Sequence, residues 1–150
     1  MKKRVFSIAL CGCVLTLLVG ASAYAQMAGS AIRINIPFAF TVRGRSLPAG
    51  NYLIRRITDE GDGLAIQNLQ HSRAHALFET EPVDERVAAR HNELIFHRYG
   101  DQYFLSEIWT AGFETGRELP VSREERAVRR ETAKNDSAWS GPDAVAVAIN

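Results

Sequence analysis

The chain is poor in the residues that most often carry chemistry. Its 150 residues contain only two cysteines, Cys11 and Cys13, and both lie in an N-terminal segment that we expect to be removed. The rest of the chain then has no disulfide, no thiolate nucleophile and no Cys-ligated metal. After residue 25 it has one lysine, Lys134, and fifteen basic against seventeen acidic residues. Such a near-neutral chain lacks the positive surface that nucleic-acid binding requires.

Long apolar runs are also missing, except at the N-terminus. Residues 2–4 are basic, residues 5–20 are uncharged and mostly apolar, and Ala23 and Ala25 form a small-residue cleavage site. This order predicts a secretory signal peptide over residues 1–25, cut after Ala25. The alternative is a membrane anchor, but the run is shorter than the ~20 residues that a spanning helix needs. We therefore expect an exported protein, periplasmic or extracellular, that does not span a membrane after cleavage.

Residues 32–42 show the clearest hydrophobic periodicity. Every even position is apolar: Ile32, Ile34, Ile36, Phe38, Phe40 and Val42. A period of two predicts a strand with one buried face and one solvated face. Pro37 cannot donate a ladder hydrogen bond, so it indicates either an edge strand or a bend between two sheets. An exposed edge at Ile32–Val42 would also be open to pairing with a strand of another protein.

Turn signals divide the chain up to Gly112 into short segments. Turns are expected at Gly44, at Leu47–Gly50 and at residues 59–63, and a polar loop at residues 83–91. Further strands are predicted at Tyr52–Ile57, Leu64–Leu69, Ala74–Thr80, Glu93–Tyr99 and Gln102–Thr110. This spacing is typical of a mainly-β fold. We expect one β domain over residues 26–112, a single antiparallel β-sandwich or partly open barrel of six to seven short strands.

The C-terminal part has a different composition. Residues 113–134 are predicted to be a connector followed by one charged helix, Arg123–Lys134. Ser122 and Glu125 have the spacing of a capping box at the start of that helix. Residues 135–150 are predicted to be a flexible tail, whose end, residues 144–150, is either a short strand or disordered.

The densest polar stretch is residues 96–109, FHRYGDQYFLSEIW. A two-residue type II′ turn at Gly100-Asp101 makes it a β-hairpin. The predicted cross-strand pairs are Arg98–Tyr103, His97–Phe104, Phe96–Leu105, Ile95–Ser106 and Leu94–Glu107. Both faces of this hairpin are mostly apolar, so we expect it to be central in the sheet and covered on two sides.

Two catalytic arrangements are compatible with the residues of this hairpin. His97 and Ser106 fall on one predicted face as diagonal neighbours, about 7–8 Å apart between Cα atoms, which would allow a Ser–His contact. Asp101 and Glu107 are the carboxylates of an alternative hydrolase site. Neither arrangement comes with a nucleophile motif or an evident oxyanion donor pair. The sequence therefore predicts no catalytic site, and a hydrolase remains the lesser alternative.

Metal and cofactor motifs are weak. His71 and His75 are four residues apart but flank a turn, and His91 adds no recognised spacing. Asp59 begins a stretch that lacks the ligand pattern of a calcium loop. No phosphate loop or dinucleotide fingerprint is present, so we predict neither a metal nor a cofactor.

Two aromatic residues are the candidate binding residues. In the predicted register, Tyr103 and Trp109 share a face of the hairpin. If the two rings are exposed, they would form a platform for sugar rings or for apolar groups of a partner. The competing interpretation is that both belong to the core, because Leu105 lies between them on the same face.

Three stretches resemble a group of small, uncharacterised exported proteins of soil bacteria. They are INIPFAFTVRGRSLPAGNYLIRR (34–56), FHRYGDQYFLSEIW (96–109) and GRELPVSREE, which ends at Glu125. The pattern is P-F-x-F-x-V, L-P-A-G-x-Y, F-x-R-Y-G and G-R-E-L-P-x-S. The resemblance implies a signal peptide, a compact β domain and a C-terminal helix, and it supplies no catalytic residue.

Together these observations predict an exported, non-enzymatic protein with a binding or envelope-structural role. Its partner is expected to be a protein or a glycan. The alternatives are a glycan-binding module that uses Tyr103 and Trp109, and a small hydrolase.

Overall fold

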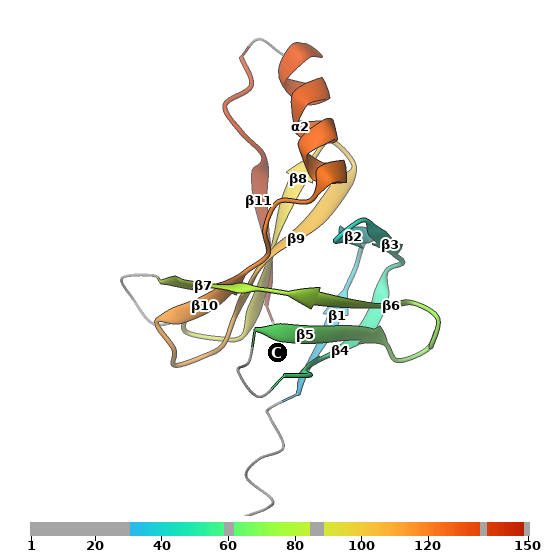
Figure 1. The fold of residues 1–150 in the computed structure, drawn as a ribbon, viewed down its shortest axis with the longest axis vertical. Helices are drawn as coiled ribbons and strands as arrows, with labels where there is room; N and C mark the ends of the chain where they lie inside the picture. The colour runs from blue at the N-terminus through green and yellow to red at the C-terminus, as the bar shows by residue number, and fades with distance from the viewer. Residues whose placement is uncertain (1–30, 59–61, 85–88, 136–137, 149–150) are drawn as a thin grey trace, which may run out of the picture. The chain divides into compact units, whose positions relative to one another are not determined.

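The computed structural model describes residues 31–58, 62–84, 89–135 and 138–148 (Figure 1). These residues form eleven strand segments and one helix, and the strands are arranged in two sheets. The predicted fold class, mainly antiparallel β with one C-terminal helix, is confirmed as a β-sandwich-like fold. The predicted signal peptide at residues 1–25 lies outside the described residues.

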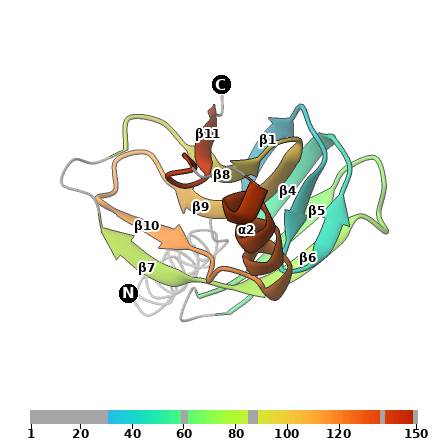
Figure 2. The ribbon, with the colours of Figure 1, turned by 90° about the horizontal axis from the view of Figure 1, so that it is seen from above.

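The first sheet has four antiparallel strands in the order β1-β4-β5-β6. The strands are β1 (Ile32–Ile36), β4 (Gly50–Arg56), β5 (Gly63–Asn68) and β6 (His75–Glu79). Seen from above, these four strands lie together on one side of helix α2 (Arg123–Asn135) (Figure 2). Strands β1 and β6 are the two edges of this sheet.

The second sheet has the order β11-β8-β9-β10-β7. Its strands are β7 (Glu81–Asp84), β8 (Glu93–Tyr99), β9 (Gln102–Trp109), β10 (Thr115–Glu118) and β11 (Asp143–Ala148). A small hairpin, β2 (Phe40–Val42) and β3 (Arg45–Leu47), joins this sheet through one parallel pairing of Thr41 with Phe104. The central position predicted for the β8–β9 hairpin is confirmed, since β8 and β9 each pair on both sides.

Two segments pass from one sheet to the other. The predicted strand over residues 32–42 divides at Pro37 into β1 and β2, which belong to different sheets. Both alternatives for Pro37 therefore apply, because β1 is also an edge. Strands β6 and β7 are separated only by Thr80, whose amide and hydroxyl both donate to the carbonyl of Asp62 at 2.9 Å.

The core is built from the apolar face predicted in the first strand. Ile34, Ile36, Phe40 and Val42 are buried. The ring of Phe40 packs edge-to-face against Tyr52 of β4 and against Phe96 of β8, with centroids 5.2 and 5.4 Å apart. Aromatic pairs in this geometry add to the stabilisation that burial alone provides. The core therefore joins the two sheets.

The turn LPAGNY has a specific structural role. The hydroxyl of the fully buried Tyr52 donates to the carbonyl of Pro48, which closes the turn back onto β4. Gly50 has a φ of +153°, and a Cβ at this position would lie 2.8 Å from Nδ2 of Asn68. Only glycine fits both constraints. This motif therefore specifies the connection between β3 and β4.

The described residues contain more strands than the six or seven predicted. Part of the expected loop at residues 83–91 continues β7, and the expected connector contains β10, which pairs with β7 and β9. Of the two alternatives for residues 144–150, the strand is observed at 143–148, where β11 pairs with β8. These segments are short and weakly periodic, so their pairing depends on distant strands rather than on local sequence.

Candidate functional site

The β8–β9 hairpin keeps the predicted register near its turn. Gly100 has a φ of +60° and Asp101 is not at positive φ, as a type II′ turn requires. The pairs Arg98–Tyr103, His97–Phe104 and Phe96–Leu105 are confirmed.

Beyond Leu105 the register shifts by one residue. Ile95 faces Glu107 and Leu94 faces Ile108, so the predicted pairs Ile95–Ser106 and Leu94–Glu107 are wrong. Ser106 is the extra residue, which makes this a β-bulge. A one-residue shift exchanges the faces of a strand. It places Ile108 in the core, where it is 4% exposed.

The bulge brings Ser106 and His97 together with a residue of helix α2. Ser106 Oγ lies 3.1 Å from His97 Nε2, and His97 Nδ1 lies 2.7 Å from Oε1 of Glu125. A carboxylate can only accept, so Nδ1 donates to Glu125. In the neutral imidazole, Nε2 then accepts the hydroxyl proton of Ser106. The Ser–His contact that the predicted register allowed is therefore present, and Glu125 is the partner that the sequence did not indicate.

Tyr99 completes this cluster. Its hydroxyl donates to the same Oε1 of Glu125 at 3.1 Å. Burial raises the pKa of Tyr99 to about 12, and the charge of Glu125 acts in the same direction. We call Ser106, His97, Tyr99 and Glu125 the helix latch, because His97 and Tyr99 hold one residue of α2 and Ser106 in turn bonds to His97.

The cap of helix α2 differs in one respect from the predicted capping box. Ser122 Oγ accepts the amide of Glu125 at 3.1 Å, as expected. Glu125 is 4% exposed, and its side chain turns to His97 and Tyr99. A buried carboxylate is tolerated only with several hydrogen-bond donors. The latch supplies them, and it fixes the first turn of α2 on the β8–β9 hairpin.

The latch has the same order of groups as a serine hydrolase relay, in which an acid orients a histidine that activates a serine. The latch differs from a hydrolase site in how far its serine is accessible to a substrate. Ser106 is only 3% exposed, and its own carbonyl accepts the amide of Leu119 at 2.7 Å. A substrate would have to displace the residues that cover Ser106 before it could contact Oγ.

The structure does not bring Tyr103 and Trp109 together on an open platform. Trp109 is 3% exposed, and its indole nitrogen donates to Glu107 at 2.7 Å. Its ring packs so closely on Gly116 that a Cβ there would be 2.7 Å away. Tyr103 is half-buried and stacks on Phe38, with centroids 4.0 Å apart. Because of the bulge, the two rings no longer share a face. Sugar binding by these residues stays a prediction.

The other residues considered for chemistry are dispersed. Asp101 is in the hairpin turn and Glu107 is six residues further along β9, so the two carboxylates do not meet. His75 contacts the carbonyl of Ser72, and His91 lies 3.7 Å from Glu93. Within the described ranges, no group of three His, Cys, Asp or Glu side chains could hold a metal ion.

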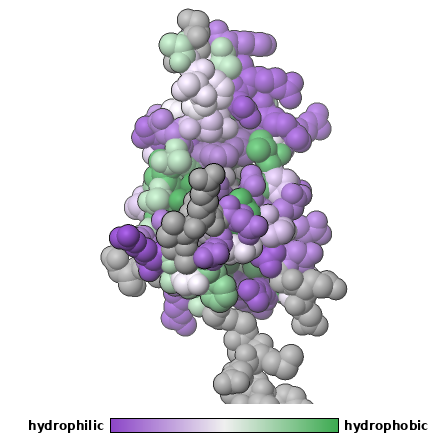
Figure 3. Space-filling model, turned by 90° about the vertical axis from the view of Figure 1, so that its left-hand side faces the viewer, coloured by the Kyte–Doolittle hydropathy of each residue, from purple (hydrophilic) through white to green (hydrophobic). Residues whose placement is uncertain are grey.

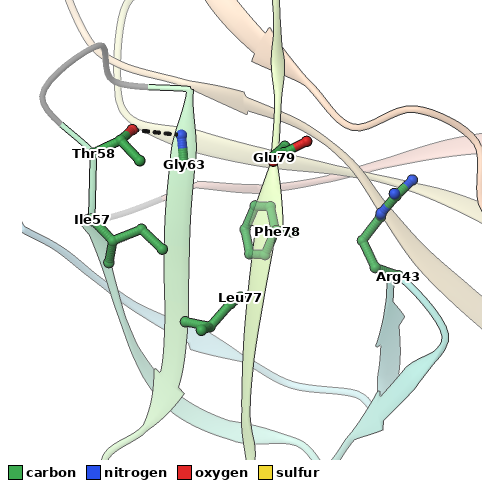
Figure 4. A pocket seen from close by; sticks show the side chains of 7 residues that line it. All are labelled: Arg43, Ile57, Thr58, Gly63, Leu77, Phe78 and Glu79. Carbon is green, nitrogen blue, oxygen red and sulfur yellow. Dashed lines mark hydrogen bonds between the residues drawn. The ribbon is translucent and has the colours of Figure 1, made fainter.

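A different surface combines exposed apolar groups with charge. A hollow of about 400 Å³ lies beside β6, and we call it the β6 hollow (Figure 4). Its lining residues are Arg43, Ile57, Thr58, Gly63, Leu77, Phe78 and Glu79. Leu77 is 65% and Ile57 44% exposed, although both are large and apolar. Strand β6 supplies three of the lining residues and β5 supplies Gly63. Ile57 and Thr58 follow the end of β4, and Arg43 enters from the β2–β3 turn (Figure 4).

The rim of the β6 hollow is held in place by one long-range and one short-range hydrogen bond. Arg43 has a φ of +48°, which is uncommon for a residue with a side chain, and its guanidinium donates to the carbonyl of Pro120 at 3.3 Å. Thr58 donates to Asp62 at 2.7 Å, and this bond is the main reason why the pKa of Asp62 is lowered. Unusual backbone conformations cluster at functional sites. The hollow is thus a formed surface with one basic and one acidic residue at its edge.

Helix α2 has a different surface character. Eight of its thirteen residues are charged, and the side chains of Arg126, Arg130 and Glu131 are exposed. In the space-filling view, the molecule is largely hydrophilic at the height of α2, whereas apolar residues gather lower on the same face (Figure 3).

Within the described residues, no helix has both the length and the apolar composition needed to cross a bilayer. No protein-family profile, curated protein or solved structure matches this chain.

Proposed function

We propose that this is an exported, non-enzymatic binding protein that holds a protein partner at the β6 hollow. The observation that carries the proposal is the exposure of Leu77 and Ile57 beside Arg43 and Glu79. Large apolar side chains that remain exposed next to fixed polar groups are typical of contact surfaces. The partner that fits is an extended segment with an apolar side chain and an acidic group near it, which Arg43 would bind.

Strand β6 supports this mode of binding. It is an edge of the first sheet, so one side of its backbone is available to an added strand. In strand addition, main-chain hydrogen bonds supply affinity and neighbouring pockets supply specificity. The sequence suggested an edge at Ile32–Val42 for this role. We favour β6 because its edge adjoins the hollow.

Site-specific photo-crosslinking tests the proposal in the exporting cell. A photoreactive amino acid replaces Leu77, and Phe113 is the control position. Phe113 is 61% exposed and apolar but does not line the hollow. We expect one discrete adduct from position 77, lost when Arg43→Glu is added, and no such adduct from position 113. Equal adduct patterns at both positions would count against the hollow.

Export belongs to the same proposal and has its own test. The supporting observation is the order of basic, apolar and small residues over 1–25. Mass spectrometry of protein from the periplasm or medium should show an N-terminus at Gln26. A cell-associated protein that retains Met1 would contradict export with cleavage.

A small hydrolase is the second candidate, because the Ser106–His97–Glu125 distances are those of a catalytic relay. A fluorophosphonate probe separates the two candidates. Labelling that Ser106→Ala and His97→Ala both abolish would favour the hydrolase. The binding proposal expects no labelling of the folded protein.

A further inference from the structure

The four strands at the ends of the two strand orders, β1, β6, β7 and β11, are protected to different degrees. Strand β7 carries two acidic residues and Pro82. Strand β6 ends on Glu79, and β1 contains Arg33 near its middle. Charges and prolines on an edge are the usual means of preventing edge-to-edge pairing. Strands β1 and β7 therefore carry such protection along the edge, and β6 carries it only at its Glu79 end, so most of the β6 edge stays open to the partner strand of the proposed function.

The fourth edge, β11, lacks such protection. Its sequence is Asp-Ala-Val-Ala-Val-Ala, and five consecutive residues from Ala144 to Ala148 are uncharged and free of proline. The single charge, Asp143, is already bound by Arg98 through contacts of 2.6 and 3.2 Å. Strand β8 pairs with one side of β11, and no described strand pairs with the other.

The side chains of β11 also leave apolar surface at this edge. Val145 and Val147 are half-buried and pack against the main core, beside Phe96 and Leu94 of β8. The three alanines are exposed. A strand placed beside β11 would therefore cover the valines and continue the core face of the sheet.

We propose that β11 is the interface for a second copy of this chain, paired antiparallel with a two-fold axis at Ala146. The segment Ala-Val-Ala-Val-Ala reads the same in both directions. An axis at Ala146 therefore places each Val145 opposite Val147 of the other copy, and each Ala144 opposite Ala148. A self-complementary surface of this kind is what a two-fold dimer requires.

This register is allowed whether the two Ala146 residues form a hydrogen-bonded or a non-hydrogen-bonded pair. A two-fold axis perpendicular to an antiparallel pair can pass through a hydrogen-bonded or a non-hydrogen-bonded residue pair. No like charges come to face each other, because Asp143 falls outside the five paired residues and is bound to Arg98. The β6 hollow is lined by other strands, so dimerisation leaves it available and goes beyond the proposed binding role.

Cysteine crosslinking tests both the interface and its register. The full chain is expressed with Cys11→Ser and Cys13→Ser, and then with Ala146→Cys or, as the matched control, Ala144→Cys. Residue 146 would face itself across the axis, within the Cα separation of about 4.4–6.8 Å that a disulfide allows. Two residues at position 144 would be separated by about 14 Å along the strands. We expect a disulfide-linked dimer from A146C only. Equal yields at both positions, or none at 146, would overturn the register.

Charge substitution provides a second test that does not depend on oxidation. Ala146→Lys and Ala146→Glu each place like charges opposite each other and should raise the dimer dissociation constant by up to about fivefold. Mixing the two variants should restore dimerisation, since Lys then faces Glu. Leu77→Lys, on another edge, should leave the dimer unchanged. Light scattering that finds the unsubstituted protein monomeric at its highest soluble concentration would overturn the proposal.

Discussion

The helix latch and the β6 hollow both contain polar side chains, but they differ in what those side chains contact. In the latch, Glu125 is buried and bonded to two strand residues. In the hollow, Leu77 is mostly exposed, while Arg43 and Glu79 lie at the rim. Polar side chains whose hydrogen-bond partners lie inside the protein stabilise the fold. An apolar side chain that is exposed to solvent is available to a partner. The polar stretch at residues 96–109 therefore supplies the strand residues that hold helix α2.

The largest effect is expected from breaking the latch. Glu125→Ala removes the acceptor of His97 and Tyr99 and leaves both donors without a partner. We expect the free energy of unfolding to fall by about 3 kcal/mol. Glu131→Ala is the control, since Glu131 is exposed on the same helix. Urea unfolding measures both, and equal values would show that Glu125 is not held as described.

A smaller but clear effect is expected where Trp109 packs. In Gly116→Ala the new Cβ would lie 2.7 Å from the indole ring, so one of the two must move. Overpacking of this kind costs about 1–3 kcal/mol. In a Trp139→Phe background, the fluorescence of Trp109 should also shift to longer wavelength. A stable Gly116→Ala with unchanged emission would mean that Trp109 is more open than the structure shows.

Alkaline pH should weaken the latch gradually. The folded-state pKa of Tyr99 is raised to about 12, above its ordinary value of 10. A raised pKa means that this contribution to stability is complete below pH 10 and is lost as pH rises through 12. Tyr99→Phe should lack this part of the decline, whereas Tyr103→Phe should keep it. Thermal unfolding between pH 9 and 12 would show no difference between the two variants if Tyr99 were neither buried nor bonded to Glu125.

The smallest effect on stability is expected in the β6 hollow. Leu77→Ser replaces a side chain that is 65% exposed, so the free energy of unfolding should change by less than about 0.5 kcal/mol. The same substitution should reduce photo-crosslinking from a probe at position 57. A loss of stability as large as that of Glu125→Ala would place Leu77 in the core instead.

Much of the fold follows from the sequence because its signals are local. The alternation over residues 32–42, the type II′ turn and the cap at Ser122 each depend on neighbouring residues. Tyr52 closes its own turn through a bond to Pro48, so the L-P-A-G-x-Y stretch is another local signal.

The regular hairpin register does not predict the bulge at Ser106, although the sequence contains a sign of it. The uniform register would place Glu107 opposite Leu94 on the core face and turn Ile108 away from it. One extra residue removes this conflict, because Ile108 then faces Leu94 and Glu107 bonds to Trp109. Burial of charge is the stronger constraint, and it overrides a regular ladder.

Neither the helix latch nor the β6 hollow can be predicted from short stretches of sequence, and the reason is the same for both. Glu125 meets His97 across 28 residues of sequence, and Arg43 meets β6 only when the β2–β3 turn packs in place. Spacing along the chain gives no indication of either encounter. Glu125 was visible only as a capping residue, and Leu77 only as part of an ordinary strand.

The central claim is that the latch acts as one structural unit, and a double-mutant cycle tests it most directly. The variants are His97→Ala, Glu125→Ala and the pair, measured by urea unfolding. The account predicts a coupling energy of about 1–3 kcal/mol, since the hydrogen bond between His97 and Glu125 is lost when either side chain is removed. A coupling energy near zero would contradict it, because His97 and Glu125 would then contribute independently and would not hold the helix together.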